Sequence, residues 1–200
     1  NVMVLASMAI ELAKLNRDPK YLRIIQDAID GVVKHVDPKR RILMENVPFN
    51  ATDITHWPEG RIFNPGHSIE VAWFLLHMLE FFPNPEHQQL ALDALEGSLE
   101  FGWDKKYGGL FYFMDVEGKP TLQLESSMKL WWPHTEALYA LVLAFRLTGE
   151  KRWLRWLEKV DDYCDAHFVD KKYGEWFGYC DRQGRRTHTC KGGNYKGFFH

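Results

Sequence analysis

Two short segments place a proline, a histidine and a glutamate in the same order at the start of a long apolar run. They read NPGHSIE at residues 64–70 and WPHTE at residues 132–136. Imidazole both removes and donates protons near neutral pH, and a helix N-terminus favours its neutral form whereas a nearby carboxylate favours its charged form. Two histidines biased in opposite directions would act as a base and an acid on the two faces of one carbon.

A repeat brings a third histidine into this set. Three aspartates each precede a histidine by thirty residues: Asp37 and His67, Asp104 and His134, Asp170 and His200. The pentapeptide DKKYG occurs at residues 104–108 and again at 170–174, a shift of 66. Repeated positions take equivalent places in a fold, so we expect all three histidines at helix starts that face one cavity. Residues 1–200 are then about three repeats of one domain, with a period of about 66.

Two kinds of helix alternate along the chain. The segments after His67 and His134, IEVAWFLLHMLEFF and TEALYALVLAFRL, are apolar almost all round and predict inner helices buried on every side. The segments KYLRIIQDAIDGVVKHV and KRWLRWLEKVDDYCDAHF repeat apolar residues at three-four spacing. They predict outer helices with one buried face.

The connections between outer and inner helices are long enough to hold strands. GLFYFMDVEGKPTLQL and EWFGYCDRQGRRTHTC predict strand, turn and strand, with the turns at residues 115–118 and 181–184. Inner and outer helices separated by β-hairpins favour an all-α toroid, and a linear α-solenoid is the alternative. Because the pattern begins and stops within a unit, we expect about half of the ring.

Composition limits the partners and the compartment. The 25 basic and 27 acidic residues leave a formal charge of -2 without long runs, which argues against nucleic-acid binding. The longest apolar run, residues 137–145, is far shorter than the roughly 20 residues that span a bilayer, so no membrane segment is expected. Three cysteines at spacings that match no zinc pattern, and a start unlike a signal peptide, favour the cytoplasm. The sequence has no HExxH motif, and no metal is expected.

Two features near the histidines are also found in proteins that act on sugars. Glu70 and Glu136 could form a glycosidase pair, although their places in the first turns offer partners for imidazoles more readily. Sugars stack on aromatic rings, and several rings occur at these points: Trp57, Phe63, Trp131, Trp132, Trp176 and Phe199. Two glycines at residues 192–193 with nearby Lys191, Lys196, Arg185 and Arg186 are only a weak signal for phosphate binding.

The segments GHSIEVAW, WWPHTEALYA and DKKYGEWFGYCDRQGRRTHTCKGGNYKGFFH resemble the N-acylglucosamine 2-epimerase family, and its animal members in particular. The resemblance covers essentially the whole chain and corresponds to the C-terminal half of those proteins. It implies an (α/α)6 barrel, of which this chain is about half. It also implies an isomerase that interconverts N-acetyl-D-glucosamine and N-acetyl-D-mannosamine by proton transfer at C2 of the open-chain sugar.

The resemblance also assigns residues. The family's acid–base histidines fall on His67, in a GHxxE motif, and on His200, in a KxxxH motif that begins at Lys196. Glu70 and Glu136 match its active-site carboxylates. His134 is not one of the catalytic pair, and we expect it to bind the substrate together with three neighbours: Trp131, Trp132 and Lys196.

Partners and alternatives also follow from the resemblance. It implies ATP or another nucleotide as an effector that is not consumed, and a homodimer. An alternative name of the animal members implies a protein that binds renin, which would make the chain an interaction module. Within enzymes, related toroids epimerise cellobiose or isomerise mannose, and the choice depends on how the pocket treats the C2 substituent.

Overall fold

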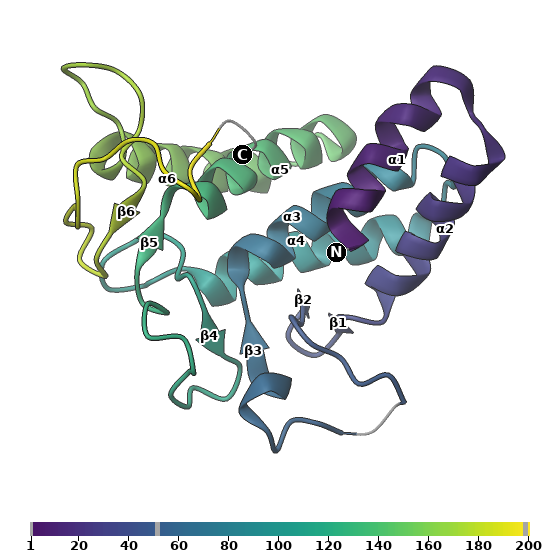
Figure 1. Ribbon diagram of the computed structural model, residues 1–200, viewed down its shortest axis with the longest axis horizontal. Coiled ribbons are helices and arrows are strands. Elements are labelled where there is room, and N and C mark those ends of the chain that lie inside the picture. The colour runs from purple at the N-terminus through teal and green to yellow at the C-terminus, as the bar shows by residue number, and fades with distance from the viewer. Residues whose placement is uncertain (1, 51–52, 198–199) are drawn as a thin grey trace.

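Three helix pairs lie side by side in an arc, as Figure 1 shows for the computed structural model, which describes residues 2–50, 53–197 and 200. The pairs are α1 (Val2–Asn16) with α2 (Pro19–Val33), α3 (Pro65–Met78) with α4 (Pro85–Gly102), and α5 (Trp131–Thr148) with α6 (Lys151–His167). Helix α3 contacts both α1 and α5, which makes these three the inner set. The predicted alternation of inner and outer helices is confirmed.

Local sequence signals explain where several helices begin. Asp18, Asn64 and Asn84 stand before α2, α3 and α4, and each side chain accepts a hydrogen bond from a backbone N–H of the first turn. A proline follows each of them at the first helical position, where its fixed φ is already suitable. Helix α5 has no side-chain cap at its start among its described contacts, and the residue after its last turn is Gly149, which has a φ of 70°.

In the described part of the chain, six short strands pair antiparallel at the end of the helices where α3 and α5 begin (Figure 1). Strand β1 (Val36–Asp37) pairs with β2 (Ile42–Leu43). Strand β3 (Ile62–Phe63), which follows a 3-10 helix at Pro58–Arg61, pairs with β4 (Met114–Asp115). Strand β5 (Lys129–Leu130) pairs with β6 (Tyr179–Cys180). Two of the three pairs therefore join one repeat to the next.

This pairing corrects one of the predicted hairpins. The turn at residues 115–118 is present, because the N–H of Gly118 donates to the carbonyl of Asp115 at 2.9 Å. Its first strand pairs with β3 of the preceding repeat, however, and no strand follows the turn before β5. Pro120 lacks the N–H that a ladder needs, which disfavours a local partner. The second predicted hairpin does form around its turn, with a bridge between Cys180 and Arg186.

The expectation that inner helices are buried on every side is right only for α3. Helix α3 lies between α1 and α5, and its apolar residues are mostly buried. Helices α1 and α5 each leave apolar side chains exposed, including Leu5, Met8, Tyr139 and Val142. An apolar sequence is buried only where a neighbour covers it, and here α1 and α5 stand at the two sides of the arc. None of the described helices is both long and apolar enough to cross a membrane.

Candidate functional site

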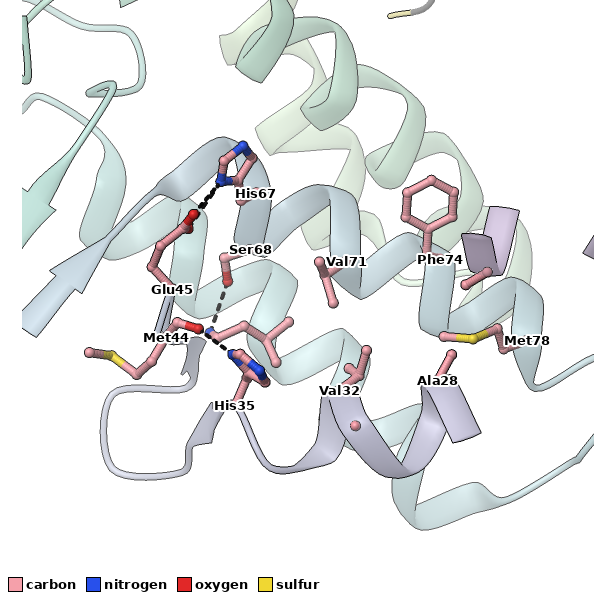
Figure 2. Close-up of a pocket in the computed structure, with 13 residues that line it drawn as sticks. Ala28, Val32, His35, Met44, Glu45, His67, Ser68, Val71, Phe74 and Met78 are labelled. Atoms are coloured by element: carbon pink, nitrogen blue, oxygen red, sulfur yellow. Dashed lines mark hydrogen bonds and ion pairs between the residues drawn. The ribbon is translucent and has the colours of Figure 1, made fainter. Parts of the chain in front are cut away.

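His67 and Glu45 form the first acid–base pair. His67 is the third residue of α3, and its backbone N–H donates to the cap residue Asn64 at 3.0 Å. Its Nδ1 lies 2.9 Å and 3.0 Å from the two carboxylate oxygens of Glu45, in the loop after β2 (Figure 2). A carboxylate at Nδ1 favours the tautomer with the proton on that nitrogen. The other ring nitrogen, Nε2, is then available to a substrate.

His200 and Glu136 form the second pair. Nδ1 of His200 lies 2.8 Å from Oε1 of Glu136, a buried carboxylate on α5. The indole N–H of Trp73, on α3, donates to the second oxygen, Oε2, of Glu136 at 2.7 Å. Both histidines therefore have the same arrangement at Nδ1, which lies at hydrogen-bond distance from a carboxylate.

Trp132 links the two pairs. Its ring centroid lies 5.1 Å from that of His67 and 5.2 Å from that of His200, with interplanar angles of 34° and 31°. Trp131 meets His200 edge to face at 5.9 Å. The structure thus brings His67, His200, Glu136 and Trp132 into one site, which we call the histidine cluster together with Glu45, Glu70, Trp73 and Trp131.

Three titratable groups of the histidine cluster lie close together. One carboxylate oxygen of Glu70, one of Glu136 and one ring nitrogen of His200 all lie within 4.8 Å of one another. Burial raises the pKa of Glu70 to about 7. The charge of Glu136 also raises this pKa, whereas His200 and His67 lower it. Burial lowers the pKa of His200, but the hydrogen bond and charge of Glu136 outweigh it and leave that pKa above its ordinary value. The cluster can hold or release a proton near neutral pH.

The same three groups are also a donor set that a divalent cation could use. One oxygen of Glu136 is bound by His200 and the other by Trp73, so the carboxylate already has a partner on each side. The same contacts argue against Glu136 as half of a glycosidase pair. The arrangement is that of an acid–base cluster.

Helix geometry explains why Glu70 and Glu136 meet, whereas His134 does not join His67. Glu70 and Glu136 are each the sixth residue after the cap of their helix, Asn64 in α3 and Leu130 in α5. His67 is the third residue after its cap and His134 the fourth. One position turns a side chain by about 100° around the helix axis. His134 therefore leaves the face that carries the glutamates.

His134 serves the fold rather than the cluster. It is fully buried, its Nδ1 lies 2.6 Å from the carbonyl of Leu130, and its Nε2 accepts the backbone N–H of Leu110 at 3.0 Å. Burial lowers its pKa to about 3. With both nitrogens bound to backbone, His134 has none left for a substrate, contrary to our expectation.

Lys196 contacts the histidine cluster through the ring of Trp131. The Nζ of Lys196 lies 2.6 Å from Oε2 of Glu175 and 4.7 Å from the ring centroid of Trp131, and its side chain is buried. Of the other aromatic residues singled out, Trp57 is exposed, Phe63 packs on Phe101 in the core, and Trp176 stacks on Phe168. Phe199 lies outside the described residues. The aromatic surface at the cluster is therefore Trp131 and Trp132.

The basic residues considered for a phosphate site each bind another part of the chain. Lys191 pairs with Asp170, and Arg185 pairs with Asp181. Arg186 donates to two carbonyls and lies over the ring of Phe177. These contacts give no support to a phosphate cradle at residues 185–196.

A cavity of about 270 Å³ lies beside the first pair, among α1, α2, α3 and β2. Its walls are mostly apolar, and Figure 2 shows Val32, Val71 and Phe74 among them. His67 and Glu45 are among the residues that line it, and Figure 2 shows the hydrogen bond that joins them. Of the members of the histidine cluster, this pair alone is among the described residues that line the cavity.

Sequence reasoning missed two members of the histidine cluster. Glu45 lies in an irregular connection with no periodicity, and no local signal identifies it. Trp73 follows Glu70 by three residues, so helical spacing places it on the same face, one turn further along α3. That spacing could have identified Trp73.

Replacement of Glu70 by glutamine is expected to increase stability above pH 7. In the folded protein Glu70 keeps its proton up to about pH 7, whereas in the unfolded chain it releases it near 4.5. The native protein therefore loses about 3 kcal/mol from this group as pH rises through that window, and glutamine does not. Urea denaturation of both proteins at pH 5 and pH 8 measures the difference. A Glu70→Gln effect that is equal at the two pH values would contradict the raised pKa.

Comparisons with known proteins identify the family of the chain. The sequence profile of the N-acylglucosamine 2-epimerase (GlcNAc 2-epimerase) family matches residues 1–200. The N-acylglucosamine 2-epimerase of Rattus norvegicus is 36% identical over 201 aligned residues, which are 99% of this chain and 48% of the rat protein. The chain thus spans about half the length of the curated relatives it matches.

Solved structures identify the architecture. The crystal structure of a D-mannose isomerase matches with a TM-score of 0.77 at 20% identity, over 95% of this chain and 48% of that one. A cellobiose 2-epimerase from Bacillus thermoamylovorans matches with a TM-score of 0.75 at 22% identity, over 96% and 47%. These neighbours are (α/α)6 barrels, so the three helix pairs are about half of such a ring, as predicted.

Proposed function

Because the chain belongs to the N-acylglucosamine 2-epimerase family, we propose that it supplies the acid–base groups of a sugar 2-epimerase. The proposed substrates are N-acetyl-D-glucosamine and N-acetyl-D-mannosamine. The observation that carries the proposal is the pair of imidazoles, His67 and His200, each held at Nδ1 by a carboxylate and each in contact with Trp132. Epimerisation needs two such groups, one for each face of C2.

The proposed reaction begins with the open-chain aldehyde, which acidifies the hydrogen on C2. One imidazole takes this proton at Nε2, and the electrons of the broken C2–H bond move into a planar enolate. The other imidazole, protonated, gives its proton to C2 from the opposite face. Glu45 and Glu136 stabilise each imidazolium as it forms, because a carboxylate at Nδ1 favours the charged ring.

The test uses the natural full-length protein that contains this chain. It is incubated with N-acetylmannosamine and ATP in deuterated water, and C2 of the sugar is followed by NMR. We expect N-acetylglucosamine that carries deuterium at C2. Product without solvent deuterium at C2 would exclude the proton-transfer scheme, and a folded protein without turnover would exclude this substrate. Parallel reactions with mannose and cellobiose show whether another sugar takes its place.

The remaining partners stay predictions from the resemblance. These are a nucleotide effector, a homodimer, a cytoplasmic location and binding to renin. The described contacts and the comparisons bear on none of them directly.

A further inference from the structure

The two histidine–carboxylate pairs differ in how the carboxylate is held. Both oxygens of Glu45 lie at hydrogen-bond distance from the same atom, Nδ1 of His67, and its side chain is 29% exposed. Glu136 uses one oxygen for His200 and the other for the indole N–H of Trp73, and its side chain is 8% exposed. A buried carboxylate with one donor on each oxygen is fixed in orientation, whereas Glu45 can exchange partners with water.

Trp73 is itself held in place by its neighbours. Its ring meets Tyr139 of α5 edge to face at 4.8 Å and His77 of α3 at 5.7 Å. Tyr139 and His77 are joined by a hydrogen bond of 2.7 Å between the hydroxyl and Nε2. The indole N–H is therefore directed at Glu136 by aromatic contacts from both helices.

We infer that Trp73 is a positioning residue of the proposed reaction: its indole N–H orients Glu136, and Glu136 orients the imidazole of His200. Helix α3 then contributes to both halves of the site, because it carries His67 and also fixes the partner of His200. The inference rests on the proposed function for its effect on turnover. The contacts that carry it do not depend on the identity of the sugar.

The first test compares Trp73→Phe with Trp153→Phe in the natural full-length protein. Both changes remove an indole N–H that has a side-chain acceptor, because Trp153 donates to Thr148 at 2.9 Å, far from the histidine cluster. We expect Trp73→Phe to lower kcat by about 10- to 100-fold with KM within about threefold, since supporting hydrogen bonds typically have effects of this size. We expect Trp153→Phe to leave kcat within about threefold.

A second measurement separates positioning from packing. Without the indole donor, the charge on Glu136 is less dispersed and favours the protonated imidazole more strongly. The limb of the kcat/KM profile that reports His200 should therefore move to higher pH in Trp73→Phe and stay in place in Trp153→Phe. An unmoved limb in Trp73→Phe would overturn the inference, whatever the change in kcat.

Two further controls keep the outcome clear. If phenylalanine unfolds the protein, benzothienylalanine at position 73 keeps both fused rings and removes only the N–H, and the same pH shift is expected. NMR titration of His200 in the native protein and in the Trp73 variant reports the shift without turnover. If the native protein has no epimerase activity but the titration of His200 differs between the native protein and the Trp73 variant, the proposed function is refuted and the positioning role of Trp73 is supported.

Discussion

Replacement of His200 by asparagine is expected to abolish epimerisation while the fold remains intact. A positioned acid–base group contributes about 10²- to 10⁴-fold to a rate, and asparagine neither accepts nor donates a proton near neutral pH. The side chain of His200 is 23% exposed, and its described hydrogen bond is to the side chain of Glu136, so we expect the helix pairs to remain in place without it. Turnover is followed by NMR in both directions, with circular dichroism to check the fold.

Isotope exchange makes this prediction sharper. If each imidazole serves one face of C2, His200→Asn should still exchange solvent deuterium into one epimer, and His67→Asn only into the other. Substitution of the exposed His188 by asparagine provides the matched control and should change neither rate. Loss of exchange from the same epimer in both variants would point to a single base. A native rate in His200→Asn would remove that residue from the mechanism.

The repeat pointed to histidines and glutamates at helix starts, and the family resemblance selected from them the groups of the proposed chemistry. The period of 66 and the apolar helices predicted the inner and outer layers, and the helix starts predicted His67, Glu70 and Glu136. Repetition misled where the repeats differ by one residue. His134 lies one position further from its cap than His67, and that rotation takes it into the core.

The partners of these groups could not be predicted, because they come from other repeats. Glu45, in the connection before α3, binds His67, and Trp73 of α3 binds Glu136 of α5. Strand β4 likewise pairs with β3 rather than with its own continuation. Periodicity describes one element at a time, whereas these contacts depend on how neighbouring units are stacked.

The DKKYG repeat shows the same limit, and it offers a matched pair for a stability test. Asp104 and Asp170 cap their own loops alike, since one carboxylate oxygen of each accepts two backbone N–H groups at 2.9 Å and 3.3 Å. The second oxygens differ. That of Asp104 binds Lys129 at 3.3 Å and Arg182 at 2.9 Å, whereas that of Asp170 binds only Lys191 among the described contacts.

Burial separates the two sites further. The side chains of Asp104 and Lys129 are 2% and 0% exposed, whereas those of Asp170 and Lys191 are 11% and 25% exposed. Burial would raise the pKa of Asp104, but Arg182, Lys129 and the loop N–H groups lower it to about 2. Asp104 is therefore ionised at neutral pH and joins the second repeat to the start of α5 and to the turn after β6.

Asp104→Asn is expected to cost about 3–5 kcal/mol of unfolding free energy, because it leaves the ammonium of Lys129 buried without a carboxylate. Asp170→Asn, the same change in the equivalent loop of the next repeat, should cost much less, since its partner Lys191 reaches water. Both asparagines keep the loop cap, so the difference isolates the ion pair. Addition of Lys129→Met to Asp104→Asn should recover most of the loss, because it removes the unpaired charge. Urea denaturation of the natural full-length protein measures all three, and equal losses at positions 104 and 170 would show that the buried pair adds nothing beyond the cap.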